Sequence, residues 1–257
     1  MFKPLQNRWI TITRPAHQAK KLIKTLEVEG ANPIAFPLLE IIKPKSPALI
    51  KRQLESLKSY DIAIFISPNA VESALNFTDK TALNALKIAA VGKKTALSLH
   101  KRGMVVDYFP NKIFNSEALL ALDELQQVQN KRIIIFRGEG GRDLLRHTLQ
   151  QRGAKVTYID VYARACPAND LELLKQHYLA HQLDIIVLTS GESLFHLLRL
   201  TGGDQWLNQV PLLVGSERIK QVFLQQNQLQ YTGKIWVSPD PSDESIYTSL
   251  VRLFQKS

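Results

Sequence analysis

The sequence repeats one pattern of residues at a constant offset of 123 positions, from Ile10 to Gly92 in the first copy. The matched pairs are Ile10 and Ile133, Ile12 and Ile135, Arg14 and Arg137, Leu22 and Leu145, Leu26 and Leu149, Gly30 and Gly153, Pro44 and Pro167, Asp61 and Asp184, Ser67 and Ser190, and Gly92 and Gly215. The pattern occurs only twice and is far longer than a solenoid repeat. It therefore predicts two similar domains.

Short apolar runs alternate with amphipathic segments in both copies, which predicts α/β domains. Each domain is expected to be a parallel sheet flanked by helices on both faces. One helix should carry Leu22 and Leu26 on its buried face and end at Gly30. The strands are predicted at residues 9–13, 62–66, 88–91, 105–109, 132–136, 154–159, 184–189, 211–214 and 235–237, with a further strand that ends at Phe36.

Two segments at equivalent places in the copies, 37–44 and 160–167, each follow a predicted strand and end in a proline. They are expected to form a two-stranded connector between the domains. One domain would then combine residues 1–36 with 168–257, and the other would span 45–159. This division requires that strand 9–13 does not lie in the sheet of strand 132–136.

The net charge of +10 indicates either a solvated basic surface or an acidic partner. Aromatic residues are not interleaved with lysine and arginine, so the pattern disfavours nucleic acid. A small polyanionic substrate fits the diffuse charge better. No apolar run reaches the length of about 20 residues that a membrane span needs. No membrane partner is expected, and a monomer is predicted.

The single cysteine, Cys166, excludes an internal disulfide, which fits a reducing cytoplasm. His177 and His181 are four positions apart but lack a third ligand, so no metal site is predicted. The glycine-rich loop from Gly138 to Gly141 is neither a G-x-G-x-x-G nor a Walker A sequence.

Small polar residues follow several predicted strands, where ligands bind in open parallel sheets. The candidate substrate-binding residues are Arg14, Ser67, Asn69, Ala70, Thr95, Arg137, Gly138, Glu139, Gly140, Ser190 and Ser216. The serines have an alternative role as helix N-caps, and the glycines have one in a tight turn. The two arginines can either bind anions or pair with local carboxylates.

Tyr162 is the candidate catalytic residue. Its repeat partner is Leu39, so the repeated architecture does not require a tyrosine there. A neutral phenol can donate a proton or a hydrogen bond to a leaving hydroxyl group. The alternative is a half-buried connector aromatic with its hydroxyl in water, and the residues alone favour this alternative slightly.

The order of several motifs resembles that of uroporphyrinogen-III synthases from about Ile10 to the C-terminal helix. The matching segments are Ile12-Thr13-Arg14-Pro15, Pro37-Leu38-Leu39-Glu40-Ile41, Ser67-Pro68-Asn69-Ala70-Val71, Ala90-Val91-Gly92 with Thr95-Ala96, Arg137-Gly138-Glu139-Gly140-Gly141-Arg142, Val161-Tyr162-Ala163-Arg164 and Leu188-Thr189-Ser190. Two positions depart from the family pattern. Ile66 replaces a threonine, and Ser216 stands nearest to a threonine that is absent after Gly215.

The resemblance implies two α/β domains with a connector and an enzyme that needs no cofactor. The implied substrate is hydroxymethylbilane, a linear tetrapyrrole with eight carboxylates. It would lose water and cyclise with inversion of ring D, giving uroporphyrinogen III for haem biosynthesis. Tyr162 matches a family tyrosine proposed to assist departure of the hydroxyl group, and Thr95 matches a family threonine in the cleft.

Two other classes compete with this interpretation. A transferase that acts on a nucleotide-linked sugar would need an acidic residue at a strand end to read the nucleotide, and the sequence offers no clear candidate. A ligand-binding protein of the hinge type is the non-enzymic alternative. Formation of the type III isomer from hydroxymethylbilane separates both from a synthase.

Overall fold

The computed structural model describes residues 3–202, 204–226 and 231–255, which fall into two compact units. The first unit combines Met1–Glu40 with Ala165–Ser257, and the second unit is Ile41–Arg164. The unit boundaries thus fall inside the two predicted connector segments. The predicted domain bounds, 1–36 with 168–257 and 45–159, stay a prediction.

The first unit contains, in its described residues, a five-stranded sheet in the order β10-β9-β8-β1-β2. Its strands are β1 (Trp9–Ile12), β2 (Asn32–Ala35), β8 (Ile185–Leu188), β9 (Leu212–Val214) and β10 (Ile235–Val237). Its helices are α1 (Ala16–Val28), α9 (Leu171–Leu179), α10 (Gly191–Thr201), η2 (Gln205–Gln209), α11 (Glu217–Gln226) and α12 (Asp243–Gln255). All neighbouring strands of this sheet pair in parallel.

The second unit has a five-stranded sheet in the order β3-β7-β6-β4-β5. Its strands are β3 (Glu40–Ile42), β4 (Ile62–Phe65), β5 (Lys87–Ala90), β6 (Arg132–Gly138) and β7 (Lys155–Ala165). Its helices are α2 (Pro47–Leu54), η1 (Leu57–Ser59), α3 (Pro68–Ala74), α4 (Lys80–Asn84), α5 (Lys93–Lys101), α6 (Ser116–Leu120), α7 (Asp123–Gln126) and α8 (Leu144–Gln151). The pairs among β4, β5, β6 and β7 are parallel.

Each sheet takes strands from both copies of the sequence repeat. In the first unit, β1 and β2 of the first copy join β8 of the second copy. In the second unit, β4 and β5 of the first copy join β6 and β7 of the second. Strand β1 therefore lies in a different sheet from β6, and the predicted α/β fold class is confirmed.

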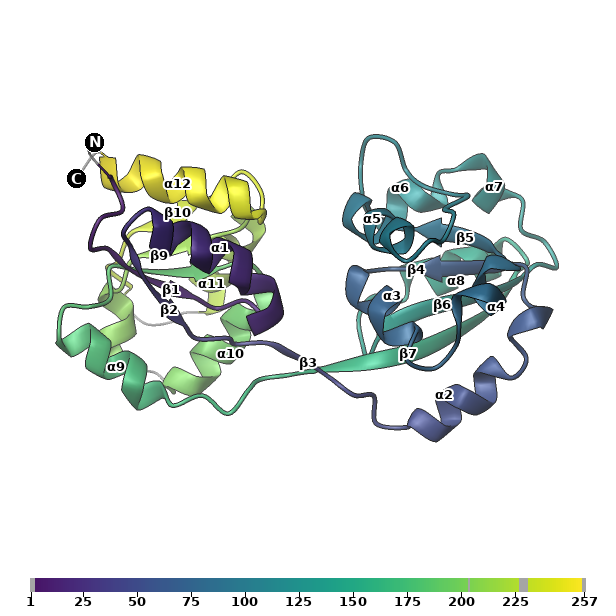
Figure 1. Ribbon diagram of the computed structural model, residues 1–257, viewed down its shortest axis with the longest axis horizontal. Coiled ribbons are helices and arrows are strands. Elements are labelled where there is room, and N and C mark those ends of the chain that lie inside the picture. Colours follow the sequence, from purple (N-terminus) through teal and green to yellow (C-terminus); the bar gives the residue numbers. More distant parts are fainter. Residues whose placement is uncertain (1–2, 203, 227–230, 256–257) are drawn as a thin grey trace. The chain divides into compact units, whose positions relative to one another are not determined.

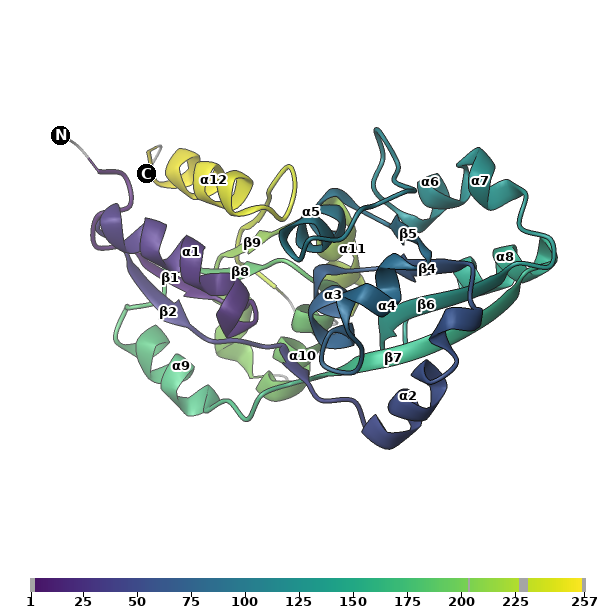
Figure 2. The same cartoon turned by 45° about the vertical axis from the view of Figure 1, so that its right-hand side comes forward.

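Helices cover both faces of each sheet because the strands are apolar on both sides. In the first unit, α1 and α12 pack on one face, while α9, α10 and α11 pack on the other (Figure 1). In the second unit, α3 and α5 share a core with one face of the sheet, and α6, α7 and α8 pack on the opposite face. Figure 2 shows α3 and α4 in front of this sheet. Such two-sided burial is the condition under which a parallel sheet is stable.

Helix α1 illustrates how the sequence sets an element. Ala19, Leu22 and Leu26 are buried at helical spacing, and the helix ends just before Gly30. Gly30 has a φ of +82°, a left-handed conformation that glycine adopts without strain. The predicted end of this helix is therefore correct.

The predicted strand at residues 105–109 is wrong. This segment forms only an isolated bridge between Tyr108 and Ala89 of β5. Val105 is 71% exposed, so its apolar side chain does not enter the core. The carboxylate of Asp107 accepts hydrogen bonds from the backbone N–H of Ile88 and from Lys87 instead. The segment therefore caps the start of β5 rather than extending the sheet.

Candidate functional site

The carboxyl ends of four neighbouring strands meet at one edge of the second unit's sheet, which we call the carboxyl edge. Phe65 at the end of β4 is level with Ala90 of β5 and Phe136 of β6, and Gly138 of β6 is level with Tyr162 of β7. The helix after β4 lies on one face of the sheet, and the helix after β6 lies on the other. Strands β4 and β6 therefore flank a topological switch point, where open α/β sheets bind ligands.

Tyr162 spans this switch point. Its hydroxyl oxygen lies 3.2 Å from the Oγ of Ser67, the residue that follows β4 and Ile66, and either group can donate the hydrogen bond. The side chain is 3% exposed and belongs to the second unit's core. The half-buried alternative with the hydroxyl in water is therefore wrong for Tyr162.

The Tyr162 ring packs directly against the backbone of Gly138. A Cβ placed on Gly138 would lie 2.5 Å from Cε2 and 2.6 Å from Cζ of Tyr162. Real side chains do not approach so closely, so any residue but glycine would displace the ring. The glycine therefore allows the ring to cross the end of β6 and its hydroxyl to reach Ser67.

Ser67 makes two hydrogen bonds through one oxygen atom. Its Oγ accepts a hydrogen bond from the backbone N–H of Ala70 at 3.1 Å, which caps the first turn of α3. The same oxygen makes the bond to Tyr162. Asn69 lies between Ser67 and Ala70 in the first turn and is partly exposed. Helix capping thus fixes the orientation of the hydroxyl group that contacts Tyr162.

The loop that follows Gly138 turns through two glycines in left-handed conformations, Gly140 at φ +73° and Gly141 at φ +100°. Its backbone is tied to β7 because the N–H of Glu139 donates to the carbonyl of Tyr162 at 2.9 Å. The Glu139 carboxylate lies 3.0 Å from Lys45 Nζ. The hydrogen bond from Lys45 lowers the pKa of Glu139, so this side chain is anionic at neutral pH.

Arg137 is engaged within the second unit. Its guanidinium donates to Asp160 at 2.8 Å and to Asp143 at 3.3 Å, and it lies 3.9 Å from the ring centroid of Tyr158. Burial opposes its charge, but the hydrogen bond to Asp160 and the nearby carboxylates outweigh burial and raise its pKa. The side chain is only 12% exposed, so local carboxylates take the donors that were expected to bind an anion.

Arg14, the repeat partner of Arg137, is likewise engaged within the first unit. Its guanidinium donates to Thr189 Oγ1 at 3.3 Å and to the Pro241 carbonyl at 2.6 Å, and it forms an ion pair with Asp243. It thereby ties the ends of β1 and β8 to the start of α12. Both arginines follow the alternative in which they pair with local groups.

The remaining predicted residues divide between the two units. In the first unit, Ser190 caps α10 by accepting from the Ser193 N–H at 3.0 Å, and Ser216 accepts from the Ile219 N–H at 3.4 Å. In the second unit, Thr95 is 3% exposed in the first turn of α5. The structure brings together Tyr162, Ser67 and Gly138, whereas Ser190, Ser216 and Arg14 belong to the other unit.

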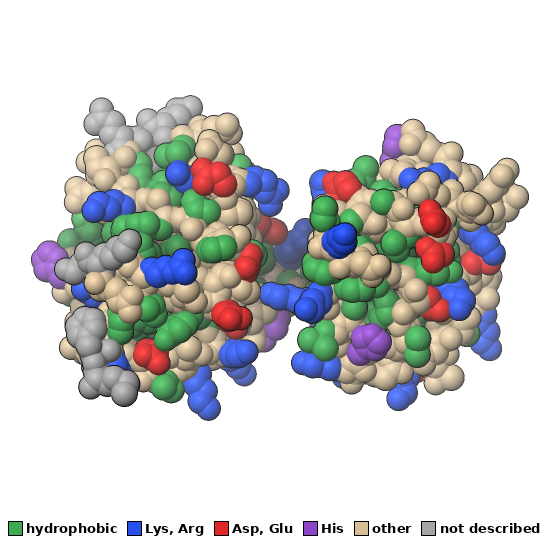
Figure 3. Space-filling view, turned by 90° about the horizontal axis from the view of Figure 1, so that it is seen from above, with side chains coloured by type: hydrophobic (Ala, Val, Ile, Leu, Met, Phe, Trp, Pro, Cys, Tyr) green, Lys and Arg blue, Asp and Glu red, His purple; other side chains and the backbone are tan. Residues whose placement is uncertain are grey.

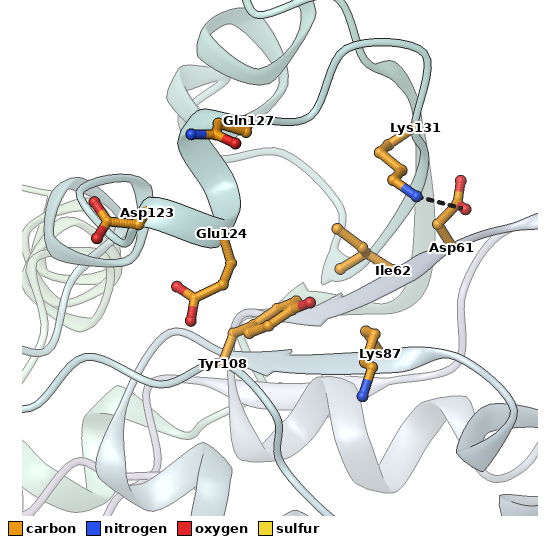
Figure 4. A pocket seen from close by; sticks show the side chains of 8 residues that line it. All are labelled: Asp61, Ile62, Lys87, Tyr108, Asp123, Glu124, Gln127 and Lys131. Atoms are coloured by element: carbon orange, nitrogen blue, oxygen red, sulfur yellow. Dashed lines mark hydrogen bonds and ion pairs between the residues drawn. The ribbon is translucent and has the colours of Figure 1, made fainter.

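A cavity of about 480 Å³ lies at the opposite, amino edge of the second unit's sheet (Figure 4). Three of its charged lining residues, Asp61, Lys87 and Lys131, are already bonded to groups of the same unit. Asp61 accepts from the backbone N–H of Arg132 at 2.8 Å and lies 3.4 Å from Lys131 Nζ. Its repeat partner, Asp184, accepts from the Trp9 N–H at 2.7 Å in the first unit. These aspartates therefore join strand starts, and we assign no chemistry to this cavity.

Lysine and arginine side chains are spread over both units. Figure 3 shows them interspersed with aspartate and glutamate on the face that is drawn. Within the described residues, no group of three or more histidine, cysteine, aspartate or glutamate side chains could hold a metal ion. The same part of the chain has no helix that is long and apolar enough to cross a membrane.

Sequence reasoning missed two partners in this region. Nothing in the spacing of Ser67 and Tyr162 shows that they touch, because their contact depends on the order of β4, β6 and β7 in the sheet. Lys45 was also missed as the partner of Glu139. The glycine at position 138 was the available signal, since it marks a close approach by another group.

Two α/β units with small polar residues at their strand ends place the chain in the class of α/β proteins that bind small molecules at strand ends. The family model for "Uroporphyrinogen-III synthase HemD" matches residues 20–247. The chain is 33% identical to the uroporphyrinogen-III synthase of Escherichia coli K12 over 219 residues, which is 83% of this chain and 89% of the relative. A relative from Salmonella typhimurium LT2 is 34% identical, over 82% of this chain and 88% of the relative.

Two solved structures share the fold. A uroporphyrinogen III synthase from Thermus thermophilus gives a TM-score of 0.62 at 18% identity and covers 96% of this chain and 99% of that chain. One from Helicobacter pylori 26695 gives 0.64 at 15% identity with the same coverage. The chain belongs to the uroporphyrinogen-III synthase family. It is an enzyme with uroporphyrinogen-III synthase activity in tetrapyrrole biosynthesis.

Proposed function

We propose that the enzyme takes hydroxymethylbilane as its substrate, removes its hydroxyl group as water and closes the ring with inversion of ring D. Family membership and the uroporphyrinogen-III synthases among its relatives support this reaction. The bilane can lose water and cyclise without an enzyme, but it then gives the non-inverted isomer. The main task of the protein is therefore to select which carbon is attacked.

The Tyr162–Ser67 hydrogen bond is the observation that carries our assignment of the chemistry to the second unit's carboxyl edge. Ser67 Oγ already accepts from the Ala70 N–H, so it can donate its own proton to the phenol oxygen. In that arrangement Ser67 does not use the Tyr162 proton, which the phenol can donate to a leaving hydroxyl group that reaches the carboxyl edge. A hydrogen bond from a neutral phenol helps the carbon–oxygen bond to break and needs no charged side chain.

We propose that backbone N–H groups and small polar side chains hold the carboxylates of the substrate. The supporting residues at the second unit's carboxyl edge are Asn69, Ala70, Thr95, Gly138 and Gly140, and those at strand ends of the first unit are Ser190 and Ser216. Arg14, Arg137 and Glu139 stay substrate-binding candidates only as positioning residues, since each is already bonded to a group of its own unit. Positioning can lower a barrier by up to about 7–11 kcal/mol in favourable cases.

We further propose that the two compact units act as the two domains and that the enzyme works as a monomer in the cytoplasm. The two separate sheets support the domain assignment. The single cysteine, which is free, is compatible with a reducing compartment.

The isomer assay tests this function directly. Purified enzyme is supplied with hydroxymethylbilane, and the porphyrin products are oxidised and separated by isomer. We expect the type III isomer in excess over the type I isomer that forms in the enzyme-free control. Product with the isomer ratio of that control would refute the proposed reaction.

A further inference from the structure

A second concave site lies in the second unit, between α2, the end of α3 and the strands β3 and β7. Its volume is about 580 Å³, which is within the range of small-molecule sites. Figures 1 and 2 both show α2 running beside β7. The walls are mainly apolar and include Ile41 and Ile42 of β3, Val161 of β7 and Phe77 beyond α3.

All charged residues that line this cavity are positive. Lys43 and Lys51 line it, and no aspartate or glutamate is among its lining residues. Neither lysine forms an ion pair with any described residue in 3–202, 204–226 or 231–255. This sets them apart from lysines such as Lys45 and Lys131, which are paired. Two lysine ammonium groups without an acidic partner, in a cavity with mainly apolar walls, favour a ligand with an anionic head and an apolar body.

Two uncharged polar side chains add to this arrangement. Ser73 of α3 and Asn76 beyond it line the cavity, and neither side chain makes a hydrogen bond to a described residue. They can therefore satisfy the oxygen atoms of a bound head group. Apolar walls with a few unengaged polar groups are the usual composition of a small-molecule site.

We propose that this cavity binds a small apolar molecule with one anionic group, such as a carboxylate or sulfonate. The site is distinct from the carboxyl edge, and it does not depend on the proposed substrate. Strand β3 begins at Glu40, the last residue of the first unit's N-terminal segment, so the bound ligand contacts the segment through which the chain enters the second unit.

Anilinonaphthalene sulfonate is a suitable probe, because it combines an apolar ring system with one sulfonate and fluoresces when it is desolvated. We expect the folded enzyme to bind it at one saturable site. The double variant Lys43→Gln with Lys51→Gln should weaken that binding about five- to tenfold, since two favourable charge interactions are lost. The variant Ser73→Leu should abolish it by filling the cavity while keeping a good helix former in α3.

The matched control is Lys20→Gln with Lys24→Gln on α1, which removes the same charge from exposed lysines of the first unit. It should leave the affinity for the probe unchanged. Equal weakening in the control, full affinity in Ser73→Leu, or no saturable binding to the folded wild-type enzyme would each overturn the proposal. The isomer assay on the same preparations reports separately on the synthase reaction, so failure of one proposal leaves the other intact.

Discussion

The contact between Tyr162 and Gly138 shows how the absence of a side chain at one residue positions the side chain of another. A phenol ring is wide, and it can cross the end of β6 only where the strand carries no Cβ. Its hydroxyl then meets Ser67, whose own orientation is fixed because it caps α3. Gly138 and Ser67 thus fix the position of the Tyr162 hydroxyl group. The contribution of each residue can be tested by a single substitution.

Replacement of Tyr162 by phenylalanine removes the hydroxyl group and keeps the ring in the core. We expect kcat for the type III product to fall several-fold without loss of all activity, because one net hydrogen bond contributes about 1–2 kcal/mol. The matched control is Tyr60→Phe, which loses a 3.0 Å hydrogen bond to Thr157 in the same unit, next to the start of β4. Turnover of Tyr162→Phe at the rate of the control would exclude Tyr162 from the mechanism.

Replacement of Gly138 by alanine should displace the Tyr162 ring. We expect a loss of about 1–3 kcal/mol in the free energy of unfolding, which is the usual effect of overpacking, together with a lower kcat. Gly191→Ala serves as the control, because a Cβ at Gly191 meets no atom within 4 Å and lies at a helix start. Denaturant unfolding of both variants measures the difference. A Gly138→Ala variant as stable and active as Gly191→Ala would contradict the packing described for Tyr162.

At the scale of elements, the sequence predicted what depends on local pattern and missed what depends on the order of strands. The apolar runs of β4 and β8 and the start of α3 at Ser67 were predicted because burial and capping leave local signals. Residues 105–109 are also largely apolar, but they lie beside β5 at the margin of the sheet, and Val105 is exposed. The Ser67–Tyr162 contact was not predictable, since it joins residues brought together only by the sheet.

The amino edge of the second unit's sheet offers a pH test of how strand starts are joined. The hydrogen bond from the Arg132 N–H, aided by Lys131, lowers the pKa of Asp61 below its ordinary value of 3.8, although burial opposes this. A carboxylate with a lowered pKa in the folded state stabilises the protein above its unfolded pKa. That contribution is lost as the pH falls through the folded-state value.

The variant Asp61→Asn should therefore be less stable than wild type at pH 7, and the difference should shrink below about pH 4. We expect less than about 1 kcal/mol, because the side chain is 41% exposed and solvent screens the charge. Thermal unfolding across this pH range measures the difference. The control Glu55→Gln changes an exposed glutamate at the end of α2. A difference that grows as the pH falls would show that the sign of this interaction is wrong.

At the scale of the whole molecule, several of the repeated positions have the same structural role in both copies. The equivalent positions Arg14 and Arg137 are both bonded internally, and Asp61 and Asp184 both join strand starts. Tyr162 departs from the repeat, since its partner in the first copy is Leu39. These four positions thus maintain two copies of one fold. The catalytic candidate Tyr162 lies where the copies differ, although its partner Ser67 belongs to a shared pair.

The net charge of +10 is a property of the whole molecule, because its field acts on the substrate before any single contact forms. A basic protein attracts a polyanion, and salt screens that attraction over a Debye length of about 10 Å at 0.1 M ionic strength. Raising NaCl from about 50 to 500 mM should therefore raise KM for hydroxymethylbilane several-fold and change kcat by less than about twofold. Initial rates of type III formation measure both constants, with the enzyme-free rate subtracted at each salt concentration.

Replacing the salt by sucrose at matched viscosity should leave KM unchanged, because sucrose does not screen charge. A KM that does not respond to salt would mean that short-range contacts alone, rather than the field of the whole molecule, capture the substrate.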